Sequence, residues 1–287
     1  MTKSNRVLVL LHCSLELAIL ICDKAKQMGM NEKGYDWIVS KEIASLLHSL
    51  DSSVFDNIQG QSNMAGRGGI HGGKWDGNVP TECKSNPSIL RLSAQLSWEA
   101  AHEPLHADID VGKACGVGPG MAFANELLSR ANSSSPRIGV VGLVPCAVGG
   151  TKISQWVKGS RLYGELVMRA NVSVTDGGVI RAILWYQGES DTVRKVDAEA
   201  YKGKMERLII DLRTDLNIPS LLIIQVGLAS GEGKFVETVR KAQQEIKWGN
   251  VKIVDSKGLR LESDHLHLTS ISEAHLGIKL AHAYLSV

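Results

Sequence analysis

The sequence predicts an α/β protein in which helices cover both faces of a mostly parallel central sheet, a three-layer α/β/α sandwich. Three observations lead to this fold class. Near-continuous apolar runs of strand length recur along the chain, as is typical of strands buried on both faces. Segments with helical spacing of apolar residues lie between these runs. Such alternation requires right-handed crossover connections, so the strands are expected to run parallel.

Most of the predicted elements fall in the second part of the chain. Strands are expected at 138–144, 179–186, 221–226 and 251–254. Helices are expected at 121–130, which follows a Gly-Pro-Gly start, and at 198–216, 235–247 and 270–285. In sheets of this kind, ligand sites form at the carboxyl ends of the strands. Functional side chains are therefore expected directly after strand ends.

Residues 1–59 are predicted to form an atypical N-terminal extension, a βαβα fragment, and 60–287 the main domain. In the extension, the apolar runs at 6–12 and 35–39 predict strands, and helical spacing predicts helices at 15–28 and 41–50. Three of its segments are Lys24-Ala-Lys-Gln-Met-Gly-Met30, Gly34-Tyr-Asp-Trp-Ile-Val39 and Ser49-Leu-Asp-Ser-Ser-Val54. Through them, residues 7–59 resemble a fragment of the ligand-binding domain of plant glutamate receptors. The fragment is too short to form that domain's ligand cleft.

The junction between the two parts is the weak point of the predicted fold. Residues 53–59 contain Asp56 and Asn57, so this segment is a poor match to a central buried strand. A strand is needed there if the residues that follow are to lie at the carboxyl edge of the sheet.

Composition excludes several classes of protein. The 287 residues carry a formal net charge of +2, which gives no electrostatic basis for nucleic-acid binding. The five cysteines are odd in number and lack CxxC spacing, which argues against a disulfide framework or a zinc site. Residues 7–22 resemble a signal peptide, but His12 and Glu16 interrupt the apolar run. A cytoplasmic location is therefore expected, with secretion as the alternative, and no membrane association.

The segment Gly60-Gln-Ser-Asn-Met-Ala-Gly-Arg-Gly-Gly69 allows tight turns and close approach of a ligand to the backbone. Ser62 lies at its start and is either a turn residue or an exposed nucleophile. A serine nucleophile needs a base and an orienting carboxylate. Asp264 and His267 have a spacing that can turn both side chains toward one point, and His265 is the competing base.

Two further patterns suggest other chemistry. His102-Glu-Pro-Leu-His106 matches the zinc-protease pattern HExxH, which requires both histidines on one helical turn. Pro104 opposes a helix there, so no metal site is predicted. Gly116-Val-Gly-Pro-Gly120 resembles a nucleotide-binding loop but does not follow a clear apolar strand, and a helix start is the favoured interpretation.

Four segments occur in the order typical of one enzyme family: Gly60-Gln-Ser-Asn-Met-Ala-Gly66, Val144-Pro-Cys-Ala-Val-Gly-Gly-Thr151, Trp185-Tyr-Gln-Gly-Glu-Ser-Asp191 and Asp264-His-Leu-His-Leu-Thr269. Through them, residues 60–287 resemble the SGNH hydrolases, which have a flavodoxin-like sandwich. The resemblance is strongest to plant carbohydrate esterases related to sialate O-acetylesterases and to the acetylxylan esterases of carbohydrate esterase family 6.

The resemblance implies a serine esterase that removes acetyl groups from carbohydrates through an acyl-enzyme, without a cofactor. Ser62 would be the nucleophile, His267 the base and Asp264 its orienting carboxylate. The oxyanion hole would use the backbone of Ser62, a backbone N–H of Gly149 or Gly150, and the Gln187 amide. Substrate-binding residues would be Asn63, Met64, Trp185, Tyr186 and Glu189, the last with a structural role as the alternative. A fusion protein impaired by a misplaced strand before Ser62 is the alternative function.

Overall fold

The computed structural model describes residues 7–11, 35–39, 54–131, 139–175 and 177–287. The chain divides into two compact units, 1–52 and 53–287. In the first unit, strand β1 (Val7–Leu11) pairs in parallel with β2 (Tyr35–Val39), as expected for these two apolar runs. The helices predicted at 15–28 and 41–50 lie outside the described residues.

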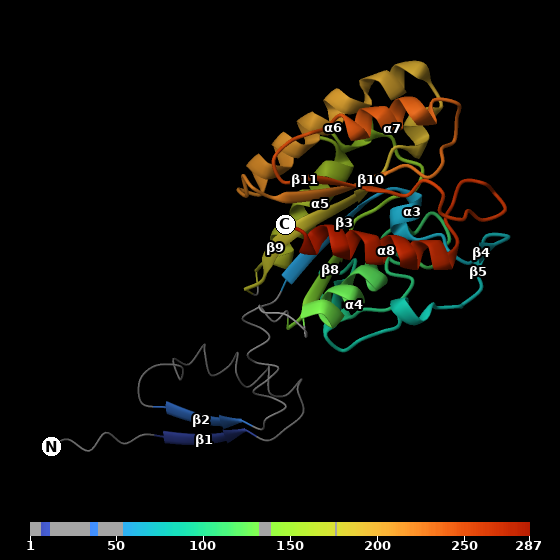
Figure 1. Cartoon of the computed structure of the whole chain (residues 1–287). Helices are drawn as coiled ribbons and strands as arrows, with labels where there is room; N and C mark the ends of the chain where they lie inside the picture. The colour runs from blue at the N-terminus through green and yellow to red at the C-terminus, as the bar shows by residue number, and fades with distance from the viewer. Residues whose placement is uncertain (1–6, 12–34, 40–53, 132–138, 176) are drawn as a thin grey trace. The chain divides into compact units, whose positions relative to one another are not determined.

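The second unit is built on a seven-stranded sheet with the order β11-β10-β9-β3-β8-β6-β7 (Figure 1). All its pairings are parallel except that of β6 with β7. The strands are β3 (Val54–Gly60), β6 (Ile89–Leu92), β7 (Trp98–Ala100), β8 (Val141–Pro145), β9 (Val179–Tyr186), β10 (Leu222–Gly227) and β11 (Val251–Asp255). The predicted fold class is confirmed, as are the four strands predicted in this part of the chain.

Strand β3 occupies the fourth of the seven positions, between β8 and β9. The residues predicted to be a poor central strand therefore lie at the centre of the sheet. Both of its neighbours are strands with strongly apolar sequences that supply backbone partners along its length. The segment forms a strand because it lies between these two partners, although its own apolar pattern is weak.

Helices cover both faces of this sheet (Figure 1). They are α4 (Gly120–Ala131), α5 (Arg161–Ser173), α6 (Lys195–Asp215), α7 (Val236–Gln244) and α8 (Ser270–Leu285). Trp185 and Tyr186 at the end of β9 point to opposite faces. The Trp185 ring packs edge-to-face on Trp156, whereas the Tyr186 hydroxyl lies 3.5 Å from Ser256 Oγ.

The α4–α8 pair packs closely. A Cβ atom added to Gly277 of α8 would lie 2.4 Å from the backbone oxygen of Pro119, just before α4 begins. The predicted helices at 121–130, 198–216, 235–247 and 270–285 correspond to α4, α6, α7 and α8, and the helix predicted to start at Gly-Pro-Gly begins at Gly120. Helix α5, strand β6 and the edge strand β7 were not predicted.

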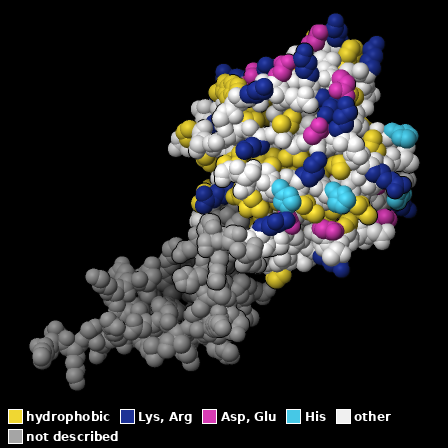
Figure 2. All heavy atoms as spheres, viewed as in Figure 1, with side chains coloured by type: hydrophobic (Ala, Val, Ile, Leu, Met, Phe, Trp, Pro, Cys, Tyr) yellow, Lys and Arg dark blue, Asp and Glu magenta, His cyan; other side chains and the backbone are white. Residues whose placement is uncertain are grey.

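Charged side chains of both signs lie on the face drawn in Figure 2. In the face drawn in Figure 2, Lys and Arg side chains are scattered with Asp and Glu among them, without one large patch of a single sign. Within the described part of the chain, no helix is long and apolar enough to cross a membrane. Cys83, Cys115 and Cys146 are buried, and Cys13 and Cys22 lie outside the described residues.

Candidate active site

Ser62 lies directly after the central strand. β3 ends at Gly60, whose φ of +141° suits glycine, and Ser62 is the first residue of the short helix α3 (Ser62–Ala65). Between them, the Gln61 N–H donates to the backbone oxygen of Tyr186 at 2.9 Å. A side chain at position 60 would collide with that same oxygen, since an added Cβ would lie 1.9 Å from it. Glycine at 60 thus lets β3 deliver Ser62 to the carboxyl edge of the sheet.

Ser62, His267 and Asp264 form a hydrogen-bonded series. The Ser62 Oγ and His267 Nε2 atoms are 3.0 Å apart, and His267 Nδ1 lies 2.6 Å from Asp264 Oδ2. An ionised carboxylate can only accept hydrogen bonds, so Nδ1 carries the proton and Nε2 is free to accept from the serine hydroxyl. This is the arrangement that turns a serine hydroxyl into a nucleophile.

Asp264, which orients the His267 ring, is itself held by backbone N–H groups of the same loop. Its Oδ1 accepts the backbone N–H groups of Leu266 at 2.9 Å and His267 at 3.0 Å. Partial burial of this carboxyl group acts to raise its pKa, but these N–H groups and the His267 ring together outweigh burial, so the pKa of Asp264 lies below its ordinary value. The carboxyl group is therefore ionised at neutral pH, as its contact with the imidazole requires.

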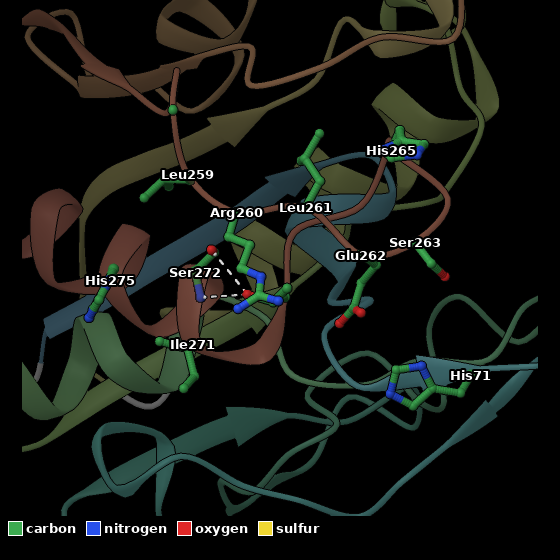
Figure 3. Close-up of a pocket in the computed structure, with 12 residues that line it drawn as sticks. His71, Leu259, Arg260, Leu261, Glu262, Ser263, His265, Ile271, Ser272 and His275 are labelled. Atoms are coloured by element: carbon green, nitrogen blue, oxygen red, sulfur yellow. Dashed lines mark hydrogen bonds between the residues drawn. The ribbon is translucent and has the colours of Figure 1, made fainter.

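His265, the competing base, lies elsewhere. It has a φ of +56° and is exposed. Its side chain lines an open cavity of about 740 Å³ together with Arg260, Glu262, Ser263 and His275 (Figure 3). The histidine that contacts Ser62 is His267. The left-handed backbone at 265 explains the difference, because it turns the intervening residue away from the point on which Asp264 and His267 converge.

The glycine pair predicted for the oxyanion hole lies beside the serine. A Cβ atom added to Gly149 would be 3.3 Å from Cβ of Ser62. The Gly149 N–H donates to Asp110 Oδ2 at 3.1 Å, so this donor already has an acceptor. Gly150 is exposed and has a φ of +72°, which glycine adopts without strain.

Gln187 lies in a buried network rather than at the surface. Its side-chain amide donates to Asp191 Oδ2 at 2.7 Å and to the backbone oxygen of Thr151 at 2.9 Å. The amide group has two hydrogens, and both are accounted for by these acceptors. The role of the amide as an oxyanion donor stays a prediction, and in this structure its hydrogens have other acceptors. Gln187 instead joins the loop after β9 to the loop after β8.

The five residues predicted to bind substrate are all at most 1% exposed, so in this structure they present almost no surface to a ligand. They are Asn63, Met64, Trp185, Tyr186 and Glu189. Met64, Trp185 and Tyr186 belong to the main hydrophobic core. Asn63 and Glu189 bond to each other, with Asn63 Nδ2 2.8 Å from Glu189 Oε1. Positions at strand ends can face the ligand or the layers above and below, and here the covering layers enclose them.

A buried ion pair of Arg67 and Asp110, which the sequence does not predict, lies near the site. Both side chains are 5% exposed, and Arg67 also donates to the backbone oxygen of Gly66 at 3.0 Å. A Cβ atom on Gly149 would lie 2.6 Å from Arg67 Nη2, so the pair borders the nucleophile. Arg67 belongs to the glycine-rich segment, but no spacing connects it to Asp110, 43 positions away.

A cavity of about 350 Å³ opens next to Gly149. Its charged lining includes Asp110, Lys113, Arg161, Glu165 and Arg169. Arg161 pairs with Glu165 at 2.7 Å, and Arg169 is buried against backbone carbonyl groups. The lysine is exposed, and a Cβ added to Gly150 would approach its Nζ atom to 2.8 Å. The cavity therefore offers cationic and hydrogen-bonding groups beside Gly149, the neighbour of Ser62.

Three glutamates are buried beneath this edge of the sheet. Burial raises the pKa of Glu103 to about 8 and that of Glu189 to about 7, and raises that of Glu273 well above its ordinary value. Glu103, from the HExxH-like segment, accepts the backbone N–H groups of Leu105 and Gly118. That segment forms turns, without a helix that would place His102 and His106 on one face.

The fold and this geometry define an α/β protein with a Ser–His–Asp constellation at the carboxyl edge of a parallel sheet. The chain belongs to the family of carbohydrate esterases described as sialic acid-specific acetylesterases, whose family model matches residues 55–286. It is 57% identical over 235 residues to the "Probable carbohydrate esterase At4g34215" of Arabidopsis thaliana, covering 80% of this chain and 89% of that protein.

Solved structures share this fold. The crystal structure of the Arabidopsis thaliana protein AT4G34215 matches with a TM-score of 0.78 and 54% identity, over 82% of this chain and 98% of that one. NanS shares the fold at 14% identity, with a TM-score of 0.63 over 82% and 97% of the two chains. XAC1771 of Xanthomonas citri, a carbohydrate acetylesterase, shares the fold at 17% identity with a TM-score of 0.55, over 82% of this chain and 57% of that one. The predicted family is confirmed for this part of the chain, and the glutamate-receptor resemblance of residues 7–59 stays a prediction.

Proposed function

We propose that the chain is a serine esterase that removes acetyl groups from carbohydrate hydroxyls through an acyl-enzyme. The observation that carries this proposal is the hydrogen-bonded series from Ser62 Oγ through His267 to Asp264. Family membership supports the ester chemistry and the carbohydrate substrate. The central position of β3 argues against the alternative of an impaired fusion, since the strand before Ser62 is in place.

The reaction follows from the site. Ser62 Oγ attacks the acetyl carbonyl carbon while His267 Nε2 takes the hydroxyl proton, and Asp264 stabilises the imidazolium that forms. Collapse of the tetrahedral intermediate breaks the bond to the sugar oxygen, which receives the proton from His267. Water activated by His267 then attacks the acetyl-enzyme, which releases acetate and restores the serine. These steps use the three side chains, a water molecule and donors for the oxyanion, and need no cofactor.

The developing oxyanion needs donors aimed at it. We assign the backbone N–H groups of Ser62 and Gly150 to this task, because the Gly149 N–H is engaged by Asp110 and the Gln187 amide is engaged in its network. The buried Arg67–Asp110 pair supports this edge of the site by holding the peptide at 149 against the serine. Gly149 itself is needed for its lack of a side chain.

The leaving sugar is assigned to the 350 Å³ cavity beside Gly149. Lys113 and Arg161 on its wall can donate to sugar hydroxyl or carboxylate oxygens. The family description names sialic acid, an acidic sugar. Comparison of acetyl esters of a neutral and an acidic sugar therefore reports on the use of these cations.

The test is hydrolysis of 4-nitrophenyl acetate, acetylated xylose and O-acetylated sialic acid by the full chain and by Ser62→Ala. Ser263→Ala, an exposed serine on the other cavity, is the matched control. We expect Ser62→Ala to lose at least about 10⁴-fold in kcat and the control to keep full activity. Mass spectrometry of a quenched reaction should place an acetyl group on the peptide that contains Ser62. Equal activity of Ser62→Ala and the wild type would reject the proposal.

A further inference from the structure

The side chain of Asn63 connects three separate segments of the site. Its Nδ2 donates to Glu189 Oε1 at 2.8 Å, and its Oδ1 accepts the Leu268 N–H at 2.9 Å. Asn63 follows the serine in the chain, and Leu268 follows His267. One buried amide therefore ties the turn that carries the nucleophile to the loop that carries the base.

This bond completes the support of His267. On the other side of the histidine, Asp264 accepts the N–H groups of Leu266 and His267, and Ser230 Oγ donates to the Leu266 oxygen at 2.5 Å. Those bonds hold the loop to itself and to the segment after β10. The bond from the Leu268 N–H to Asn63 Oδ1 attaches the loop to the residue next to Ser62. It therefore directly affects the distance between Ser62 Oγ and His267 Nε2.

Glu189 fixes which way the Asn63 amide faces. Its carboxyl group is fully buried, and Oε2 has no hydrogen-bond partner in the part of the chain that the structure describes. Oε1 can accept from Asn63 whether Glu189 is ionised or carries its proton on Oε2. With an acceptor on the Glu189 side, the NH₂ group must face Glu189 and the oxygen must face the Leu268 N–H. A flipped amide would set two donors against each other at Leu268.

We propose, resting on the esterase function above, that Asn63 and Glu189 are positioning residues that hold His267 at hydrogen-bond distance from Ser62 and do not bind the sugar. Both side chains are enclosed, with 0% exposure, so neither presents a surface to a substrate. Their effect is expected on the acylation step, because a misplacement of about 1 Å can cost roughly a hundredfold in rate.

The test exchanges donor and acceptor. In Asn63→Asp, the new carboxylate can still accept from Leu268, but it faces Glu189, and two carboxyl groups then compete at one contact. In Glu189→Gln, the side-chain oxygen can still accept from Asn63. In the double variant, Gln at 189 donates to Asp at 63, which restores the bond in the reverse sense. The three variants thus separate the contact from the side chains that form it.

The expected result is specific to positioning. Asn63→Asp should lose about a hundredfold in kcat for 4-nitrophenyl acetate, with KM unchanged. The kcat of Glu189→Gln should stay within about threefold of wild type. The kcat of the double variant should recover to within about tenfold of wild type. Asn78→Asp is the matched control, because Asn78 Nδ2 makes the same type of bond, to Asp76 Oδ2 at 3.0 Å, on the surface. This control should leave the kinetics unchanged.

Two outcomes would overturn the proposal. The first is a double variant that melts like the wild type yet stays as slow as Asn63→Asp. The second is a crystal structure of Asn63→Asp in which the Ser62–His267 distance remains 3.0 Å. The structural readout does not depend on turnover. If the wild type proves inactive and Ser62→Ala changes nothing, the esterase proposal fails while the positioning claim is still decided by that distance.

Discussion

Ser62 Oγ and His267 Nε2 lie 3.0 Å apart although the two residues are 205 positions apart in the chain. Their contact follows from the topology, because β3 and β11 run in the same direction and both end at one edge of the sheet. The serine follows β3 directly, and the histidine lies in the connection from β11 to α8. The loops after β8 and β9 reach the same edge, which brings Gly149 and Gln187 to it.

The two nearby histidines should differ sharply in importance. We expect His267→Asn to lower kcat by at least about 10⁴-fold, since His267 Nε2 is the atom placed 3.0 Å from Ser62 Oγ to take its proton. His265→Asn should stay within about threefold of wild type, because asparagine tolerates the left-handed backbone at 265. Steady-state hydrolysis of 4-nitrophenyl acetate by the two variants checks this. A larger loss in His265→Asn than in His267→Asn would contradict the assignment of the base.

Gly60 is expected to tolerate no side chain. Gly60→Ala would place a Cβ atom 1.9 Å from the Tyr186 oxygen that accepts the Gln61 N–H. We expect it to lower the free energy of unfolding by at least about 3 kcal/mol. Gly72→Ala is the control: its φ is also positive, +56°, but no atom lies within 4 Å of the added Cβ. It should cost about 1 to 2 kcal/mol, the strain of the backbone alone. Urea unfolding of both variants measures the difference.

The sequence was sufficient for the parts of the fold with strong periodicity. Strands β8 to β11 and helices α4, α6, α7 and α8 carry clear apolar patterns, and all were predicted. Strand β3 was doubted because Asp56 and Asn57 interrupt its pattern. Its place in the sheet depends on pairing with β8 and β9, which follow about 80 and 120 residues later in the sequence. Pairing with such distant strands leaves little trace in the sequence of β3 itself.

The candidate site was predictable where contacts follow from short spacing. Asp264 and His267 are three positions apart, so their convergence could be expected. Burial could not. An apolar run indicates an enclosed strand but does not tell whether its last residues face solvent, and so Trp185 and Tyr186 were expected to line the substrate site. The Arg67–Asp110 pair joins segments with no common pattern, and only the folded structure brings it together.

A chain that begins at residue 53 is expected to fold and to show the proposed esterase activity. Every strand of the seven-stranded sheet and every residue of the Ser–His–Asp series lies in the unit 53–287. A chain that begins at residue 61 should lose both properties, since it lacks the central strand β3. Circular dichroism and hydrolysis of 4-nitrophenyl acetate by the two truncated chains test this. An active chain without β3, or an inactive chain with it, would contradict the prediction.

Stability should fall as pH rises because of the buried glutamates, and Glu273 offers the cleanest test. Burial raises the pKa of this carboxyl group well above its ordinary value of 4.5, and neighbouring Glu103 and Glu189 raise it further. Neither of its oxygens has a hydrogen-bond partner among the described residues. Above about pH 4.5 the unfolded chain loses this proton while the folded chain keeps it, so each step up in pH favours unfolding.

Glu273→Gln cannot ionise, and its buried amide costs the same at every pH. Relative to wild type, the variant should therefore gain melting temperature steadily between about pH 5 and about pH 8, although Glu103 and Glu189 still titrate in both proteins. Glu199→Gln on α6, whose side chain is 58% exposed, is the matched control and should show no such trend. Thermal melts across this range supply the measurement. A constant difference between wild type and Glu273→Gln would mean that Glu273 ionises alike in the folded and unfolded chains, which its burial does not allow.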